Sequence, residues 1–293
     1  MVAKAPMQLI ETQQWLDPVA DQLQPAIANA LAADGSIGPK IANTLHGTWL
    51  GHPLHPVLTD LPIGAWTATA VLDVLDGISG RETFGRAAQT TITVGLVGAA
   101  GAALTGLADW SKMGGGHARR VGLAHGLMNT TSVACYITSL MLRRRQARRA
   151  GRGFAWLGLL ISTAAAYLGG HLVYSQQIGV DHTADQSPPE TFEPVLEEAE
   201  LAENQLRRVH ANGMAILLLR QGERIYALAE TCAHLGGPLA EGTFDGTSVV
   251  CPWHGSRYAL QDGRVLEGPS AHAQPCLEVR VRNGQIEVRA ADR

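Results

Sequence analysis

The chain is 293 residues long, which allows two domains, and it is 46% hydrophobic and 17% charged with a formal net charge of −3. The small net charge excludes no class of partner by itself. The averages conceal an uneven distribution, because the long apolar segments are confined to residues 57–178.

Residues 1–45 have a mixed composition, with a short helical pattern from Val19 to Ala33 and prolines at positions 6, 18, 25 and 39. No charged stretch followed by an apolar core opens the chain, so we expect no cleavable signal peptide. This part is predicted to be an N-terminal segment outside the membrane.

Four apolar segments follow, at residues 57–78, 87–110, 121–142 and 154–178. Each has about the 20 residues that a helix needs to cross ~30 Å of hydrocarbon. Small residues crowd the second and fourth segments, and glycine and alanine let helices approach closely in lipid. We therefore predict an all-α four-helix transmembrane bundle over residues 46–179. A large soluble helical domain is the alternative, which the nearly uncharged second and fourth segments disfavour.

The orientation of the bundle is predicted from its arginines. Six arginines occur between Arg143 and Arg152, in the connection between the third and fourth segments. The positive-inside rule places this connection in the cytoplasm, so four crossings leave both termini on the outer side of the membrane. A domain with a metal cluster on that side would need export in the folded state, and Arg148-Arg149 before the fourth segment is a weak match to a twin-arginine signal.

The histidines of the membrane half are predicted to lie toward one face of the bundle, together with Asp60. An ionisable residue in a membrane segment indicates a functional site. One interpretation is a b-type haem held by two imidazoles, with His125 and His171 best matched in depth and His52 or His55 as substitutes. Another is a quinone site in which histidine and Asp60 accept protons. A third is that these side chains only cap helices and join them by hydrogen bonds.

The stretches HPLHPVLTDLP at residues 52–62 and GGHLVY at residues 169–174 resemble an uncharacterised family of four-helix bacterial membrane domains. The resemblance implies a multi-pass protein of the bacterial cytoplasmic membrane, in contact with the lipid bilayer, and it implies no chemistry.

Residues 180–203 are acidic and contain Pro188, Pro189 and Pro194, and they are predicted to be a linker. The sequence permits either a flexible tether or a linker clamped to its neighbours.

Short β-like runs follow over residues 204–293, with hairpin signals at Gly222 and at Asn283-Gly284. They predict a small antiparallel β-sandwich. The whole chain is therefore expected to be multidomain, with the bundle followed by this β domain.

The β domain contains Cys232-x-His234, then sixteen residues, then Cys251-x-x-His254. Each half offers one thiolate and one imidazole on a segment too short and glycine-rich to be helical. Two thiolates suit one iron and two imidazoles a second iron of a sulfide-bridged pair. Tetrahedral zinc is the alternative for two Cys and two His, but zinc motifs commonly pair Cys with Cys and His with His.

This motif resembles that of the Rieske [2Fe-2S] family, and the resemblance covers residues 201–293. Some members of the membrane family above are fused to such domains. The resemblance implies a [2Fe-2S] cluster held by Cys232, His234, Cys251 and His254. Ser256 and Tyr258 match hydroxyls that, in quinol-oxidising relatives, donate hydrogen bonds to a bridging sulfide and a ligand thiolate and raise the reduction potential. Ordinary turn chemistry and packing are the alternative for these two residues.

In those relatives a second cysteine in each loop forms a disulfide, but this chain has Gly237 and Trp253 there, as Rieske ferredoxins do. We expect one-electron transfer between a membrane donor, quinol or haem, and a partner redox protein. The alternatives are a ferredoxin component that feeds an oxygenase, and a redox sensor. Whether the chain is itself an oxidoreductase stays open. No nucleotide-binding motif occurs, and no nucleic-acid partner is predicted.

Overall fold

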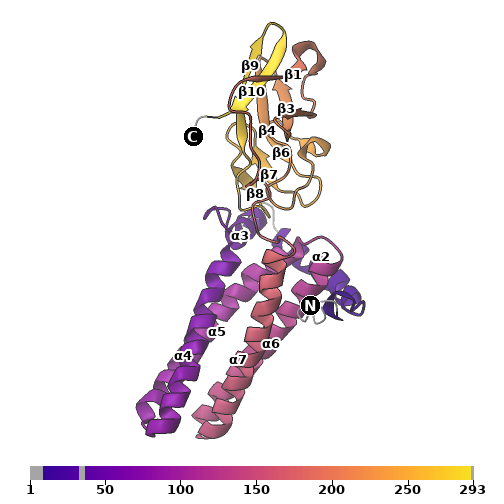
Figure 1. Ribbon diagram of the computed structural model, residues 1–293. Coiled ribbons are helices and arrows are strands. Elements are labelled where there is room, and N and C mark those ends of the chain that lie inside the picture. The colour runs from indigo at the N-terminus through magenta and orange to yellow at the C-terminus, as the bar shows by residue number, and fades with distance from the viewer. Residues whose placement is uncertain (1–8, 33–36, 292–293) are drawn as a thin grey trace. The chain divides into compact units, whose positions relative to one another are not determined.

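The computed structural model describes residues 9–32 and 37–291 of the chain. The chain folds into two compact units: one joins residues up to Gly38 with Pro53–Gln177, and the other joins Pro39–His52 with Ile178–Arg293. The first unit is helical and the second is mainly β (Figure 1). This confirms the predicted fold class, whereas the predicted domain boundaries at residues 46, 180 and 204 stay predictions.

Four long helices form the first unit: α4 (Leu54–Ser79), α5 (Glu82–Ser111), α6 (His117–Arg144) and α7 (Arg148–Tyr174). Consecutive helices are neighbours, and α4 also packs against α7, so α4 and α6 lie diagonally opposite. The shorter helices α2 (Leu16–Ala32) and α3 (Ile37–His46) precede them in the chain. Figure 1 shows the four long helices running side by side.

Within the described residues, three helices are long and apolar enough to cross a membrane: α4, α5 and α7. Helix α6, predicted as the third crossing, is not one of them. It has arginines near both ends and a polar run from Asn129 to Ser132, followed by Thr138 and Ser139. Ser132 donates a hydrogen bond to the Gly158 carbonyl of α7 at 2.8 Å, and Ser139 donates one to the Gly151 carbonyl at 2.6 Å. Ser132 and Ser139 of α6 therefore bind a neighbouring helix.

Glycines on α5 and α7 lie against large side chains of the helices that precede them. A Cβ at Gly95 would collide with the Trp66 indole, and a Cβ at Gly158 would lie 2.9 Å from the Tyr136 ring. Each glycine therefore permits an approach that alanine would prevent. This is the close packing predicted from the small residues of these segments.

The arginine-rich stretch was predicted to connect the third and fourth segments, but most of it is helical and continues α6 and α7. Arg143 is 3% exposed and donates two hydrogen bonds to Asp73 of α4, at 2.7 and 2.5 Å. Arg152 lies 3.4 Å from the carboxylate of Asp76. These two positive charges are therefore paired with carboxylates of α4.

Helix α2 packs on the start of α6 and the end of α5, where Leu16 and Ala20 contact Trp110 and Leu123. Arg120 at the start of α6 donates two hydrogen bonds to the Asp17 carboxylate, at 2.8 and 2.6 Å. This bond lowers the pKa of Asp17. An apolar contact and an ion pair therefore hold α2 on the bundle.

The β domain consists of two antiparallel sheets. The six-stranded sheet has the order β1-β10-β9-β4-β3-β2, and the four-stranded sheet has the order β5-β6-β7-β8. The predicted hairpin at Asn283-Gly284 joins β9 to β10, and both turn residues have the positive φ angles that this turn requires, 52° and 76°. The strands are β1 (Glu193–Glu197), β2 (Arg207–Ala211), β3 (Met214–Gln221), β4 (Arg224–Ala229), β5 (Thr243–Phe244), β6 (Ser248–Val250), β7 (Arg257–Ala259), β8 (Val265–Glu267), β9 (Cys276–Arg282) and β10 (Gln285–Ala290).

The stretch predicted to be a linker is part of the β domain. Residues 193–197 form β1, which pairs with β10 at the edge of the larger sheet. Earlier in the stretch, the amide of His182 donates a hydrogen bond to the Ala233 carbonyl at 3.1 Å. The linker is therefore clamped at both of these points.

The segment at residues 39–52, which the sequence analysis divided between the N-terminal segment and the bundle, packs on the β domain. The Asn43 side chain donates a hydrogen bond to the Leu266 carbonyl and accepts one from the Gly268 amide, both at 2.9 Å. His46 is 2% exposed, and a Cβ at Gly268 would lie 3.1 Å from its ring.

Candidate metal centre

Two tight loops of the β domain bring Cys232 and Cys251 together. In the first loop, between β4 and the short helix η2 (Leu239–Glu241), the Cys232 amide donates a hydrogen bond to the Gly237 carbonyl at 2.8 Å. In the second loop, between β6 and β7, the Cys251 amide donates one to the Ser256 carbonyl at 2.8 Å. Each loop closes on its own cysteine, because Gly236 and Gly255 adopt φ angles of 76° and 79° that favour glycine.

The four predicted ligands lie in two pairs. The two cysteines are 1% and 3% exposed, and their side chains are hydrogen-bonded to each other. The rings of His234 and His254 lie edge to face with centroids 5.1 Å apart. A Cβ at Gly237 would lie 2.8 Å from the Cys251 Sγ, so glycine is required for the loops to approach this closely.

Metal binding needs thiolates and neutral imidazoles, and the pKa values of Cys251 and His234 are shifted toward these forms. The hydrogen bond from Cys232 lowers the pKa of Cys251 to about 6, and the same bond raises the pKa of Cys232. Burial lowers the pKa of His234 to about 3, and nearby histidines contribute to the shift: His254, His46, His182 and His272.

The donor set fits a two-iron cluster. The Nδ1 atom of His234 is buried without a hydrogen-bond partner, although buried polar atoms are nearly always bonded. An iron would satisfy this nitrogen. Nowhere in the described part of the chain do three or more His, Cys, Asp or Glu side chains form a group that could hold one ion. The two pairs therefore suit two irons better than one tetrahedral zinc.

Ser256 and Tyr258 are both fully buried near the cysteines. The Tyr258 hydroxyl lies 3.1 Å from the Cys232 Sγ and can donate a hydrogen bond to a thiolate there. Burial, followed by the charge of Cys232, raises the pKa of Tyr258, so its hydroxyl keeps its proton. The Ser256 Oγ accepts a hydrogen bond from the Ser270 amide at 3.0 Å.

Gln274 supports the first loop by hydrogen bonds, and it is not among the residues predicted from the sequence. This side chain is 1% exposed and accepts a hydrogen bond from the Ala233 amide at 3.0 Å. It also donates to the carbonyls of Ala229 and Thr231, at 2.7 and 2.6 Å. No motif marks a lone glutamine before a strand, so no signal in the sequence identified it.

The five predicted residues of a membrane site lie in different places. His55 and His125 face each other in the bundle, with ring centroids 6.3 Å apart. His171 instead lies 3.3 Å from the carboxylate of Glu11. His52 belongs to the other unit, where its ring meets the edge of His272 with centroids 5.7 Å apart. Asp60 is on an exposed face of α4.

Comparisons with known proteins match two successive parts of the chain to two different families. The model of a predicted membrane protein family (DUF2231) matches residues 51–182, and that of the Rieske [2Fe-2S] domain matches residues 191–279. Ferredoxin CarAc of Metapseudomonas resinovorans is 36% identical over 84 residues, which cover 28% of this chain and 78% of the ferredoxin. The Rieske iron-sulfur subunit of the cytochrome bc1 complex of Streptomyces lividans is 37% identical over 67 residues, 22% of this chain and 39% of the subunit.

One solved structure similar to the chain is the complex of reduced oxygenase and oxidized ferredoxin in carbazole 1,9a-dioxygenase. A chain of that complex is 28% identical, and the match covers 35% of this chain and 95% of that chain with a TM-score of 0.33.

Proposed function

Because the chain belongs to the Rieske [2Fe-2S] family and has a DUF2231 membrane domain before its Rieske domain, we propose that it is a membrane-anchored electron carrier. It takes single electrons from a quinol in the membrane and passes them to a partner redox protein. The observation that carries this proposal is the paired arrangement of two buried cysteines and two histidines with ring centroids 5.1 Å apart.

Cys232 and Cys251 would hold one iron, and His234 and His254 the other. The bound [2Fe-2S] cluster supplies reversible one-electron chemistry. The protein contributes hydrogen bonds that favour the more negative, reduced state, and the Tyr258 hydroxyl at 3.1 Å from the Cys232 Sγ is placed to donate one. Burial of the cysteines keeps water from the thiolate pair.

A ferredoxin component that supplies an oxygenase is the second candidate. Gly237 supports it, because a Cβ at this position would lie 2.8 Å from the Cys251 Sγ, so a second cysteine could not enter the first loop without displacing the ligand. The loops are therefore joined without the disulfide of quinol-oxidising relatives. A redox sensor is a third candidate and predicts no turnover with either type of donor.

We place the Rieske domain on the extracytoplasmic side of the bacterial cytoplasmic membrane. The support is the arginine-rich junction of α6 and α7, which includes Arg144, Arg145 and Arg149 besides the paired Arg143 and Arg152. Alkaline phosphatase fused after residue 293 is expected to be active, because that enzyme needs the periplasm. An active fusion with a cytoplasmic reporter instead would reverse the orientation.

Quinol oxidation is tested with full-length protein purified in detergent. The oxidised protein is mixed with a reduced quinone analogue, and the EPR signal of the reduced cluster is followed over time. We expect the signal to appear at the rate of quinol consumption. Reduction by a ferredoxin reductase with NADH, but not by quinol, would favour the oxygenase component. The Cys232→Ser variant, which lacks a ligand, is the control for signals that do not come from the cluster.

A further inference from the structure

The two helical hairpins of the bundle, α4–α5 and α6–α7, carry matching side chains at matching positions. His55, Trp66 and Asp73 of α4 each have a counterpart on α6 that lies 70 positions later: His125, Tyr136 and Arg143. Thr69 and Ser139 are separated by the same interval, and both are buried. The spacing of these positions is therefore the same on both helices.

The second helix of each hairpin repeats as well. Gly95, Ala102 and Gly106 of α5 have the same mutual spacing as Gly158, Ala165 and Gly169 of α7. The glycines lie against matching side chains. Gly95 contacts Trp66 as Gly158 contacts Tyr136, and Gly106 contacts His55 as Gly169 contacts His125. The bundle therefore has an internal twofold pseudosymmetry that relates one hairpin to the other.

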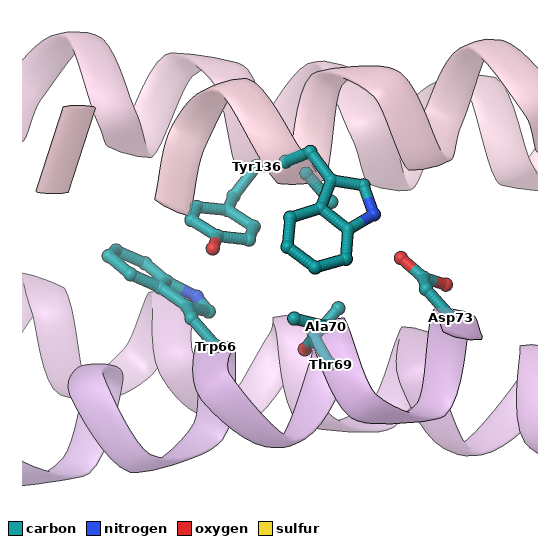
Figure 2. A pocket seen from close by; sticks show the side chains of 7 residues that line it. Trp66, Thr69, Ala70, Asp73 and Tyr136 are labelled. Carbon is teal, nitrogen blue, oxygen red and sulfur yellow. The ribbon is translucent and has the colours of Figure 1, made fainter. Parts of the chain in front are cut away.

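Because α4 and α6 are diagonally opposite, their matching side chains meet on this pseudosymmetry axis. Asp73 and Arg143 form a bidentate ion pair, and Trp66 stacks on Tyr136 with ring centroids 4.1 Å apart and an angle of 14°. Figure 2 shows the stacked pair, with Asp73 further along α4. The space between them, lined also by Thr69 and Trp156, has no part wide enough for a water molecule. The Asp73–Arg143 pair and the Trp66–Tyr136 pair therefore form two layers of side chains along the axis, with no room for a ligand between them.

The third layer, His55 with His125, is arranged differently. The His55 Nδ1 binds the Ala102 carbonyl and the His125 Nδ1 binds the Ala165 carbonyl, both at 2.8 Å. A carbonyl accepts only from N–H, so each ring has its proton on Nδ1 and a lone pair on Nε2. No hydrogen bond joins the two rings in the described structure, and their centroids are 6.3 Å apart. The Asn129 side-chain amide donates a hydrogen bond to the His125 Nε2 at 3.2 Å, and a metal bound there would replace this donor.

We propose that His55 and His125 together bind one metal centre on the axis of the bundle, through their Nε2 atoms. Metal-ligating histidines usually donate the other ring N–H to a carbonyl or carboxylate, as both of these do. Two imidazole nitrogens bound at about 2.0–2.1 Å to one metal place their ring centres roughly 6 Å apart, close to the observed separation. The assignment depends only on the bundle and not on the proposed function of the Rieske domain.

The chemistry of this centre favours haem iron. In the described residues no third His, Cys, Asp or Glu joins the pair to complete a metal site. A porphyrin supplies four nitrogens and needs only two axial ligands from the protein, and imidazole is a common axial ligand. A free transition-metal ion is the other source of the same chemistry, and it would need ligands from outside the chain.

The test is the metal and haem content of full-length protein purified in detergent. Haem is measured by the pyridine haemochrome assay, and total metals are measured by mass spectrometry after incubation with haemin or with zinc and copper salts. We expect about one haem per chain, reduced at least tenfold in His55→Ala and in His125→Ala. The matched control is His117→Ala, an exposed histidine on the same helix as His125, which should keep the full haem content.

A second variant separates ligation from folding. Methionine can also bind haem iron, so His125→Met should keep haem but shift its α band and potential, whereas a purely structural role would produce no such shift. The thermal unfolding midpoint of the helices, followed by circular dichroism in detergent, shows whether the bundle of each variant is folded. A single non-haem metal that depends on both histidines would support the site with a free ion as its source. No metal beyond the cluster iron, or haem that is retained in both alanine variants, would overturn the proposal.

Discussion

The hydroxyl of Tyr258 lies 3.1 Å from the Sγ of Cys232, and neither side chain is exposed to more than 1%. A hydrogen bond to a buried thiolate stabilises the reduced cluster more than the oxidised one, because reduction adds negative charge. We therefore expect this contact to raise the reduction potential of the proposed cluster.

Replacement of Tyr258 by Phe should lower the reduction potential by roughly 50 mV. A hydrogen bond to a charged group contributes about 1.5–3 kcal/mol, part of which is specific to the reduced state, and ~59 mV corresponds to a tenfold change for one electron. An EPR-monitored redox titration measures the shift. Tyr226→Phe in β4 is the matched control and should leave the potential unchanged. An unchanged potential in Tyr258→Phe would show that the hydroxyl has no electronic role.

Replacement of Gln274 by Met, which has a similar volume, should destabilise the β domain by about 2–3 kcal/mol. The Ala229 and Thr231 carbonyls and the Ala233 amide would lose their partner inside the protein. The cluster should be lost at lower denaturant concentration, as measured by its visible absorbance in urea. Gln261→Met, at an exposed position, is the control. Equal midpoints for the two variants would contradict the proposed support of the loop.

Replacement of Asp73 by Asn should destabilise the bundle by about 3 kcal/mol or more, because Arg143 would keep a buried charge without its partner. The thermal unfolding midpoint in detergent measures the effect. The double variant Asp73→Leu with Arg143→Met removes both charges and should recover much of the loss. Glu82→Gln, which breaks the exposed pair with Arg148, should change stability by less than about 1 kcal/mol. A similar midpoint for Asp73→Asn and Glu82→Gln would contradict this prediction.

Cys276 should resist alkylation by iodoacetamide at pH 8. Burial, with a contribution from the charge of Asp262, raises the pKa of Cys276 to about 11. Because the folded pKa is raised, the stabilisation by the neutral thiol is complete below the unfolded pKa near 9 and is lost as the pH rises toward 11. Mass spectrometry of the alkylated protein gives the fraction modified. An exposed cysteine introduced by Ala184→Cys is the reference, and equal labelling of the two thiols would contradict the assignment.

Much of the β domain could be predicted, because the responsible signals are local. Asn283-Gly284 determines its own hairpin, since both residues accept positive φ angles. Likewise, each ligand loop closes over a few residues, so the order of Cys232, His234, Cys251 and His254 was sufficient to indicate the cluster. The confirmed antiparallel arrangement of the strands follows from the alternation of apolar and polar residues along them and from the turn residues that join them.

Contacts between distant segments could not be predicted from the sequence. Residues 39–52 were expected to be divided between the N-terminal segment and the bundle, because nothing in the spacing of Asn43 indicates that it binds Leu266 and Gly268. His125 was expected to pair with His171, because the two residues have similar depths in their helices. The depth of a residue along its helix does not specify which helices lie diagonally opposite in the bundle. His55 and His125 meet because α4 and α6 are diagonally opposite.

By itself, the sequence determined the class of each part of this protein: apolar segments of membrane length, strands with hairpin turns, and a ligand motif with a Rieske spacing. These properties depend on neighbouring residues and on the periodicity of helices and strands. Only the tertiary structure decided that Arg143 is buried against Asp73, that Gln274 supports the first ligand loop, and that the two hairpins meet in matched pairs along one axis. Each of these contacts joins residues far apart in the chain, and its geometry depends on how whole helices and sheets pack.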